Sequence, residues 1–190
     1  MRKPMKLKVM SIVHGQSEYR ICSSIKSNLR LKHEIIAREK GKTSIQITSI
    51  LDVLNDKRFN NFKNFINYFD GIEYKRQELI GFSLFIIMDV DDCTPIQKRK
   101  FISKEMFKGH WLYDYIVPIY NDPNLEKTMQ EANISVNKKK NYILIFPTNH
   151  GDLDIDIAKE FLNKLEKCNC SNLNEYVSYC ILIAEENLLL

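Results

Sequence analysis

A nearly continuous apolar run over residues 82–88, Phe-Ser-Leu-Phe-Ile-Ile-Met, constrains the fold more than any other segment. A strand with one face in water alternates apolar and polar side chains, whereas an almost unbroken apolar strand must be covered on both faces. The run is also far shorter than the roughly 20 apolar residues of a membrane span. We therefore predict a central strand of a mostly parallel sheet, flanked by helices on both faces.

The rest of the chain alternates between short apolar runs and segments in which apolar residues recur at helical spacing. Further strands are predicted at 7–13, 33–38, 113–120 and 142–146. Helices are predicted from about residue 17, from 44, over 59–68, from 95, from the cap at 122–124 to about 131, from about 154 and in the last 20 residues. This alternation is typical of an α/β fold with a helical C-terminus.

Length and composition favour a single domain inside the cell. A chain of 190 residues with 44% hydrophobic and 27% charged residues can bury one substantial core. We expect one domain over residues 1–190, with a motif-bearing core at about 5–150 and C-terminal helices at about 154–187. The apolar stretch Val9–Val13 is too short for a signal peptide, and the five cysteines are odd in number. A cytoplasmic protein with reduced thiols and no membrane contact is the expectation.

Three carboxylates, Asp89, Asp91 and Asp92, directly follow the predicted central strand. In open α/β sheets, ligands bind at the carboxyl ends of the strands. Carboxylates at positions i and i+2 can share a hard cation, and one or two such groups with water and substrate phosphate are typical of Mg²⁺. The sequence therefore predicts a Mg²⁺ or Mn²⁺ site here. The alternative is that Asp91 or Asp92 only caps the helix that begins at Pro95.

Two motifs resemble the Toprim domain of topoisomerases, primases, OLD-family nucleases and small RloB-like proteins. Residues 10–19, Met-Ser-Ile-Val-His-Gly-Gln-Ser-Glu-Tyr, look like the first motif of that superfamily, a strand that ends in a Glu-Gly turn. Residues 85–92, Phe-Ile-Ile-Met-Asp-Val-Asp-Asp, look like the second, a strand that ends in DxD. The resemblance spans about residues 5–95 and implies a Toprim-like fold, a divalent metal and phosphodiester chemistry on nucleic acid.

The first motif departs from the family at one position, because His14 stands directly before Gly15 where the family has its glutamate. That glutamate serves the metal or acts as a general acid or base. A neutral imidazole can ligate a transition metal or take a proton, and Glu18 follows one helical turn later. We predict His14 and Glu18 as catalytic residues and Gly15 as the turn residue. The alternative for His14 is a turn residue with a satisfied hydrogen bond.

Lys40 and Lys42 flank Gly41 in a loop between a predicted strand and a predicted helix. The loop is not a Walker A motif, because Ile36 stands where that motif needs its first glycine. Two lysines at a helix N-terminus can nevertheless bind a phosphate. We predict Lys40 and Lys42 as phosphate-binding residues, with an exposed basic turn as the alternative. A nucleotide-binding domain built on this loop is a weaker hypothesis.

Other polar segments favour structural roles. Residues 148–156 are polar and acidic and could lend a second cation ligand through Asp152 or Asp154, but Asp154 is better explained as a helix cap. Glu126 is interpreted as a first-turn helix acid and Trp111 as a buried aromatic anchor.

The leading functional hypothesis is a Toprim-like, Mg²⁺- or Mn²⁺-dependent nuclease. Nucleic acid is the expected partner, and the net charge of +4 is compatible with a phosphate-bearing ligand. The resemblance to OLD and RloB-like proteins also implies a role in bacterial defence against phage DNA beside an ATPase partner. The alternative is a catalytically inactive Toprim-like module that binds nucleic acid or an ATPase.

Overall fold

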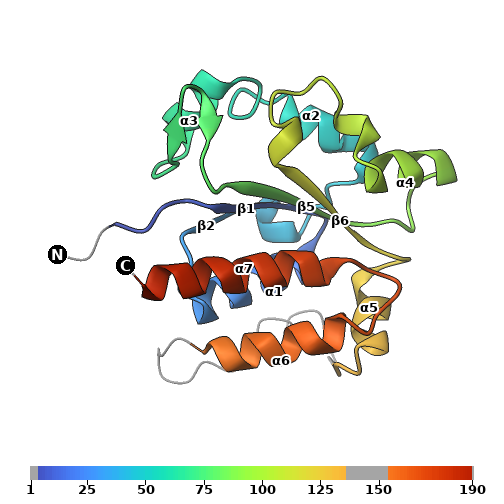
Figure 1. The fold of residues 1–190 in the computed structure, drawn as a ribbon. Helices are drawn as coiled ribbons and strands as arrows, with labels where there is room; N and C mark the ends of the chain where they lie inside the picture. Colours follow the sequence, from blue (N-terminus) through green and yellow to red (C-terminus); the bar gives the residue numbers. More distant parts are fainter. Residues whose placement is uncertain (1–3, 136–153, 190) are drawn as a thin grey trace.

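The computed structural model describes residues 4–135 and 154–189. The predicted strand at 142–146 and the polar residues 148–153, Asp152 among them, lie outside the described residues. Within the described part, the chain forms an α/β fold with a parallel sheet, helices on both faces and a helical C-terminus, as the apolar pattern predicts (Figure 1).

Among residues 4–135 and 154–189, four strands form the main sheet, in the order β2-β1-β5-β6. They are β1 (Val9–Val13), β2 (His33–Ile36), β5 (Ser83–Asp89) and β6 (Ile116–Asn121). All three neighbouring pairs are parallel. The apolar run lies in β5, between β1 and β6, and the prediction of a central strand is confirmed.

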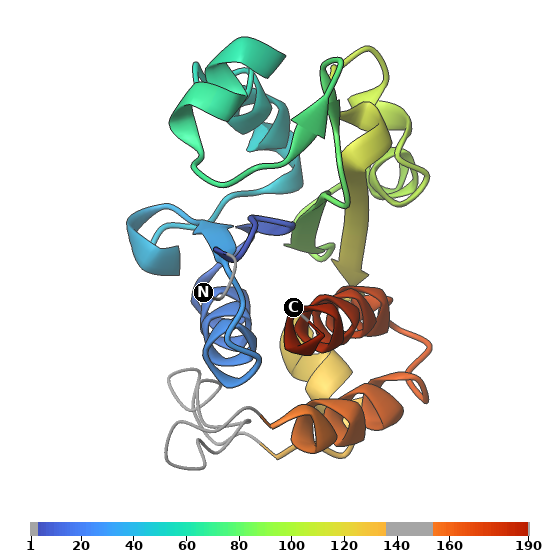
Figure 2. The same ribbon diagram turned by 60° about the vertical axis from the view of Figure 1, so that its left-hand side comes forward.

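Each face of the sheet packs on its own set of helices, and the alternation of side chains along β5 explains why. Phe85 and Ile87 enter the core that packs on α1, α5, α6 and α7, whereas Leu84, Ile86 and Met88 enter the core that packs on α2, α3 and α4. Figures 1 and 2 show these two groups of helices on opposite faces of the sheet. The first set comprises α1 (Gln16–Asn28), α5 (Leu125–Glu131), α6 (Ile155–Leu165) and α7 (Leu173–Leu188). The second comprises α2 (Ile50–Leu54), α3 (Phe62–Tyr68) and α4 (Pro95–Ile102).

Three local predictions were wrong. The segment from Ser44 does not open a helix; after an irregular stretch it forms a 3₁₀ turn, η2 (Ile47–Ser49), and then the short α2. Residues at the start of the predicted strand 113–120 form a 3₁₀ turn, η4 (Tyr113–Tyr115), before β6 begins. The first helix begins at Gln16, with Gly15 rather than Ser17 at its N-cap.

A small antiparallel hairpin, β3 (Tyr74–Lys75) and β4 (Glu78–Leu79), has no counterpart in the prediction. Its two turn residues, Arg76 and Gln77, have positive φ angles of 50° and 68°. Such turns usually contain Asn-Gly or a similar pair. Arg-Gln is not such a pair, so the hairpin could not be predicted from the sequence.

Among residues 4–135 and 154–189, no helix combines the length and the apolar character needed to cross a membrane. The five cysteines are free thiols, as expected. The remaining short elements are η1 (Glu39–Gly41) and η3 (Glu105–Phe107).

Candidate functional site

The two motifs meet at one edge of the sheet. β1 and β5 are parallel neighbours with Val13 opposite Ile87, so the turn after β1 lies beside the end of β5. The backbone N–H of His14 extends this pairing and donates to the Ile87 carbonyl at 2.9 Å. The arrangement brings the predicted residues His14, Glu18 and Asp89 to the carboxyl ends of two central strands, where α/β folds bind ligands.

Glu18 lies in the first turn of α1, next to this edge of the sheet. Its Oε2 accepts a hydrogen bond from the Gly15 backbone N–H at 2.9 Å, and only 3% of the residue is exposed. A β-carbon at position 15 would lie 3.3 Å from Oε2, so a glycine there leaves room for the carboxylate. Glu18 therefore caps the helix and at the same time brings a buried negative charge to the site.

Asp89 ends β5 and is 7% exposed. Its Oδ1 accepts from the Leu125 backbone N–H at 3.0 Å and from Asn121 Nδ2 at 3.3 Å. Burial, reinforced by the charges of Glu18 and Glu126, raises the pKa of the Asp89 carboxyl from 3.8 to about 8, although the charge of His14 and the Leu125 N–H oppose the shift. An anion in this position needs a compensating positive charge.

The amide that touches Asp89 belongs to a buried polar network at the end of β6. Asn121 Oδ1 accepts from Thr128 Oγ1 at 3.2 Å and from Ser171 Oγ at 3.0 Å, and the residue is fully buried. Both functions of the Asn121 amide are thus used, which fixes its orientation. Sequence reasoning missed this residue, because a single Asn at a strand end carries no distinctive pattern.

Glu126 is the second residue that sequence reasoning underestimated. It lies in the first turn of α5, as predicted, but its Oε1 also accepts a hydrogen bond from Ser17 Oγ at 3.1 Å, across the gap between α5 and α1. Its charge contributes to the raised pKa of Asp89. The available signal was its place just past a third strand, β6, whose carboxyl end lies at the same edge.

Asp91 and Asp92 differ from Asp89 in being exposed. Asp91 Oδ2 accepts from Asn124 Nδ2 at 3.3 Å, which ties it to the N-cap of α5. Neither aspartate caps α4, because Thr94 occupies that position and its Oγ1 accepts from the Gln97 N–H at 3.3 Å. The capping alternative for the acidic cluster is therefore wrong.

His14 is partly buried, and its ring is anchored to the next loop. Nδ1 lies 3.0 Å from the Ile45 carbonyl oxygen, and the Ile45 N–H donates to the His14 carbonyl at 2.8 Å. Because a carbonyl oxygen only accepts, Nδ1 carries the proton in this bond, and Nε2 of the neutral ring has a lone pair. The two interpretations of His14 are therefore compatible: its hydrogen bond to Ile45 satisfies it as a turn residue, and Nε2 is still available to act as a base.

The loop with Lys40 and Lys42 lies beside the turn that follows β1. Gly41 has a φ of +84°, and a β-carbon there would lie 2.6 Å from the Gly15 carbonyl oxygen and 2.7 Å from the Gln16 backbone. This close approach brings the two exposed lysines to the border of the site. The expectation that they stand at a helix N-terminus was wrong, because Lys40 lies inside a 3₁₀ turn (Glu39–Gly41) and Lys42 follows it.

No group of three or more His, Cys, Asp or Glu side chains within residues 4–135 and 154–189 is placed to hold a metal ion by itself. Mg²⁺ commonly has only one or two protein carboxylates, with water and substrate completing its shell. Asp89 and Glu18 fit that smaller requirement. Asp154 accepts from the Ile157 N–H at 3.0 Å and caps α6, in agreement with its structural interpretation.

Comparison of the chain with protein-family models, with curated proteins and with solved structures finds no match. The resemblance to the Toprim superfamily therefore stays a prediction, and the function is inferred from the geometry of the site.

Proposed function

We propose that this chain is a Toprim-like domain that processes phosphodiester bonds of nucleic acid with the help of Mg²⁺ or Mn²⁺. One observation carries the proposal: the Asp89 carboxyl is buried beside Glu18 at the carboxyl ends of two adjacent parallel strands, with its pKa raised to about 8. Such a group is costly to ionise in the free protein, and a divalent cation would offset that cost.

Asp89 and Glu18 would hold the ion, with Asp91 at the exposed rim. Glu126 would provide a further carboxylate from α5, either to the ion directly or through water. A divalent ion at this position supplies positive charge for the phosphate and for the leaving oxygen. Hard oxygen ligands of this kind suit Mg²⁺ and Mn²⁺.

Side chains of the protein would provide proton transfer and phosphate binding. His14 Nε2 can accept a proton from the attacking water, because the Ile45 carbonyl fixes the ring with its proton on Nδ1. The ammonium groups of Lys40 and Lys42 would contact backbone phosphates next to the scissile bond. The resemblance extends the proposal to a defence nuclease that works beside an ATPase partner, as an analogy only.

A cleavage assay tests the proposal. Supercoiled plasmid, linear duplex and single-stranded oligonucleotides are incubated with Mg²⁺, Mn²⁺ or EDTA. We expect metal-dependent cleavage of at least one substrate, a loss of at least about 100-fold in Asp89→Asn and Glu18→Gln, and wild-type activity in Asp156→Asn. Asp156 is a suitable control because it is an exposed acid on α6.

Absence of cleavage with every metal, together with a melting temperature that Mn²⁺ does not change, would refute the enzymatic proposal. The inactive binding module would then be the better hypothesis, and the replacement of the family's glutamate by His14 favours it. In that case nucleic-acid or ATPase binding should persist in Asp89→Asn.

A further inference from the structure

A polar hollow of about 360 Å³ lies at the β2 edge of the sheet, between this strand and the loop after α2. Its volume is in the range of small-ligand sites, about 300–1,000 Å³. Ile45 and Val53 form part of its apolar lining. Two arginines, Arg38 and Arg58, and three acids contribute the polar part.

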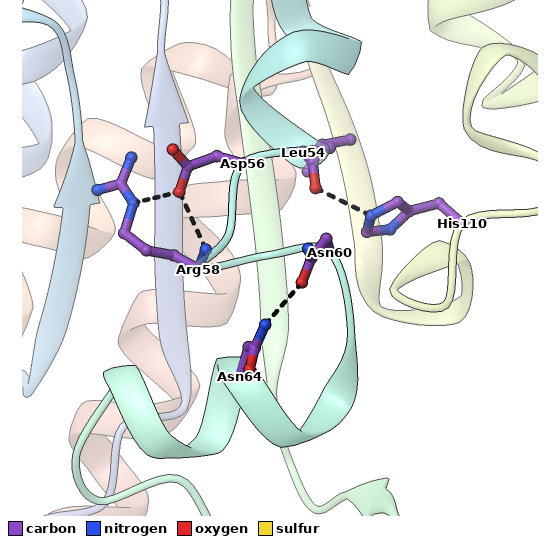
Figure 3. Close-up of polar contacts among 6 residues, drawn as sticks. All are labelled: Leu54, Asp56, Arg58, Asn60, Asn64 and His110. Atoms are coloured by element: carbon purple, nitrogen blue, oxygen red, sulfur yellow. Dashed lines mark hydrogen bonds and ion pairs between the residues drawn. The ribbon is translucent and has the colours of Figure 1, made fainter.

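Arg58 is held rigidly at this hollow. Its Nε and its backbone N–H both donate to Asp56 Oδ1, at 2.8 and 3.0 Å (Figure 3). Its guanidinium carbon also lies 5.5 Å from the centroid of the Phe59 ring and 5.6 Å from that of Tyr68. A planar cation fixed in this way is ready to stack or to donate hydrogen bonds without losing further side-chain freedom.

The mixture of charges restricts the ligand. Asp52, Asp56 and Glu34 line the same hollow as the two arginines, so it has no net positive charge. A phosphate offers only acceptors and would be repelled by the three carboxylates. A nucleobase offers both donors and acceptors on its edges and a flat face for stacking, and it therefore suits both the arginines and the acids.

The hollow is directly connected to the candidate site. Ile45 lines it, and both backbone groups of Ile45 bond to His14, at 3.0 Å to Nδ1 and 2.8 Å to the carbonyl oxygen. Arg38 also lines it, and the Arg38 backbone carbonyl accepts from the Gly41 N–H at 2.8 Å, within the loop that carries Lys40 and Lys42. A nucleic-acid strand whose phosphates contact these lysines would therefore run beside the loop that borders the hollow.

We propose that this hollow, which we call the β2-edge pocket, binds one base of a single-stranded segment of the substrate next to the candidate site. The inference rests on the proposed nucleic-acid substrate and adds its strandedness. A base in a duplex is stacked and paired, so only an unpaired base can present its edge and its face to Arg58 and Asp52.

Fluorescence anisotropy in EDTA tests the pocket separately from catalysis. Fluorescein-labelled 12-mer single strands are compared with a series in which one abasic site is moved along the strand. We expect abasic sites at one or two adjacent positions to weaken binding about 5- to 10-fold, and the others to have no effect. The matched duplex should bind more weakly than the single strand.

Variants then locate the effect. Arg58→Ala and Arg38→Ala should abolish the position-specific loss, and Arg58→Lys should abolish it while keeping the salt dependence of binding. Lys164→Ala removes one exposed positive charge from α6, on the other face of the sheet, and should leave the abasic profile unchanged. Arg38→Ala keeps the test valid if Arg58→Ala does not fold.

A flat abasic profile in the wild-type protein would overturn the inference, as would a wild-type profile in Arg58→Ala. Cleavage with a flat profile would refute the pocket and leave the proposed function intact. A position-specific profile without cleavage would support the pocket and refute only the enzymatic activity.

Discussion

Asp89→Asn should stabilise the metal-free protein at neutral pH, although it removes the residue at the centre of the candidate site. The buried carboxyl has a pKa of about 8 in the folded state, against 3.8 as its ordinary value. Asparagine has nearly the same shape and keeps an oxygen that can accept from the Leu125 N–H, the 3.0 Å bond of the native side chain. The substitution therefore removes the cost of burying a carboxyl that is ionised in the unfolded chain, and it keeps a hydrogen bond.

The size of the effect follows from the difference between the two pKa values. Because the folded state holds the proton more tightly, the free energy of unfolding of the wild-type protein falls as pH rises from about 4 to about 8, by about 1.4 kcal/mol per pH unit. Asp89→Asn lacks this contribution. Its advantage over the wild type should be near zero at pH 4 and on the order of 4 kcal/mol at pH 7.

Urea denaturation in EDTA at several pH values between 4 and 8 measures this difference, with Asp156→Asn as the control for a change of charge. Saturating Mn²⁺ should reverse the order at pH 7, because the ion stabilises the wild-type protein and has no comparable ligand in Asp89→Asn. If the difference between the two proteins did not depend on pH, the carboxyl would not be held protonated by its surroundings, and the reasoning would fail.

Three further changes test other parts of the structure. Gly41→Ala should cost about 2 kcal/mol or more in urea denaturation, because a β-carbon would collide with the turn after β1, whereas Gly109→Ala, also at positive φ but with no atom within 4 Å, should cost about 1 kcal/mol. Asn121→Ala removes the three buried hydrogen bonds that the amide makes with Asp89, Thr128 and Ser171, and it should lower the free energy of unfolding by about 2–4 kcal/mol. Burial lowers the pKa of His33 to about 3, so its contribution to stability is present above pH 6.5 and is lost as pH falls, by about 2 kcal/mol at pH 5. The variant His33→Gln should lose this acid sensitivity in the same measurement.

The layers of the fold could be predicted because burial on both faces leaves a direct trace in sequence. β5 is apolar at nearly every position, since Phe85 and Leu84 enter opposite cores. Short-range geometry was harder to predict. The hairpin turn at Arg76 and Gln77 uses positive φ angles without glycine or asparagine, so local preference does not indicate it. The flanking strands have tertiary contacts instead: the Tyr74 ring packs against Phe62, and the Leu79 N–H donates to the Tyr115 hydroxyl at 3.0 Å.

The candidate site, like the fold, could be predicted only in part from the sequence. His14, Glu18 and Asp89 were identified because each follows an apolar strand, and parallel strands bring their carboxyl ends to one edge. Glu126 was dismissed, because a first-turn glutamate is a common helix acid and only the fold places it opposite Ser17. The β2-edge pocket has no sequence motif either, since its charged groups come from two separate segments, residues 34–38 and 52–58.

Asp89 should lower the stability of the metal-free protein at neutral pH, yet hydrogen bonds from its neighbours hold it in one orientation at the edge of the sheet. The Asn121 amide donates to Asp89 and accepts from Thr128 and Ser171, three residues that belong to different elements or loops. If residue 89 served stability alone, asparagine, which has nearly the same shape and no charge, could take its place without a loss of stability. A carboxyl that is held in a fixed orientation, and whose ionised form burial disfavours, is the arrangement expected of a binding site for a cation, in which function takes precedence over stability.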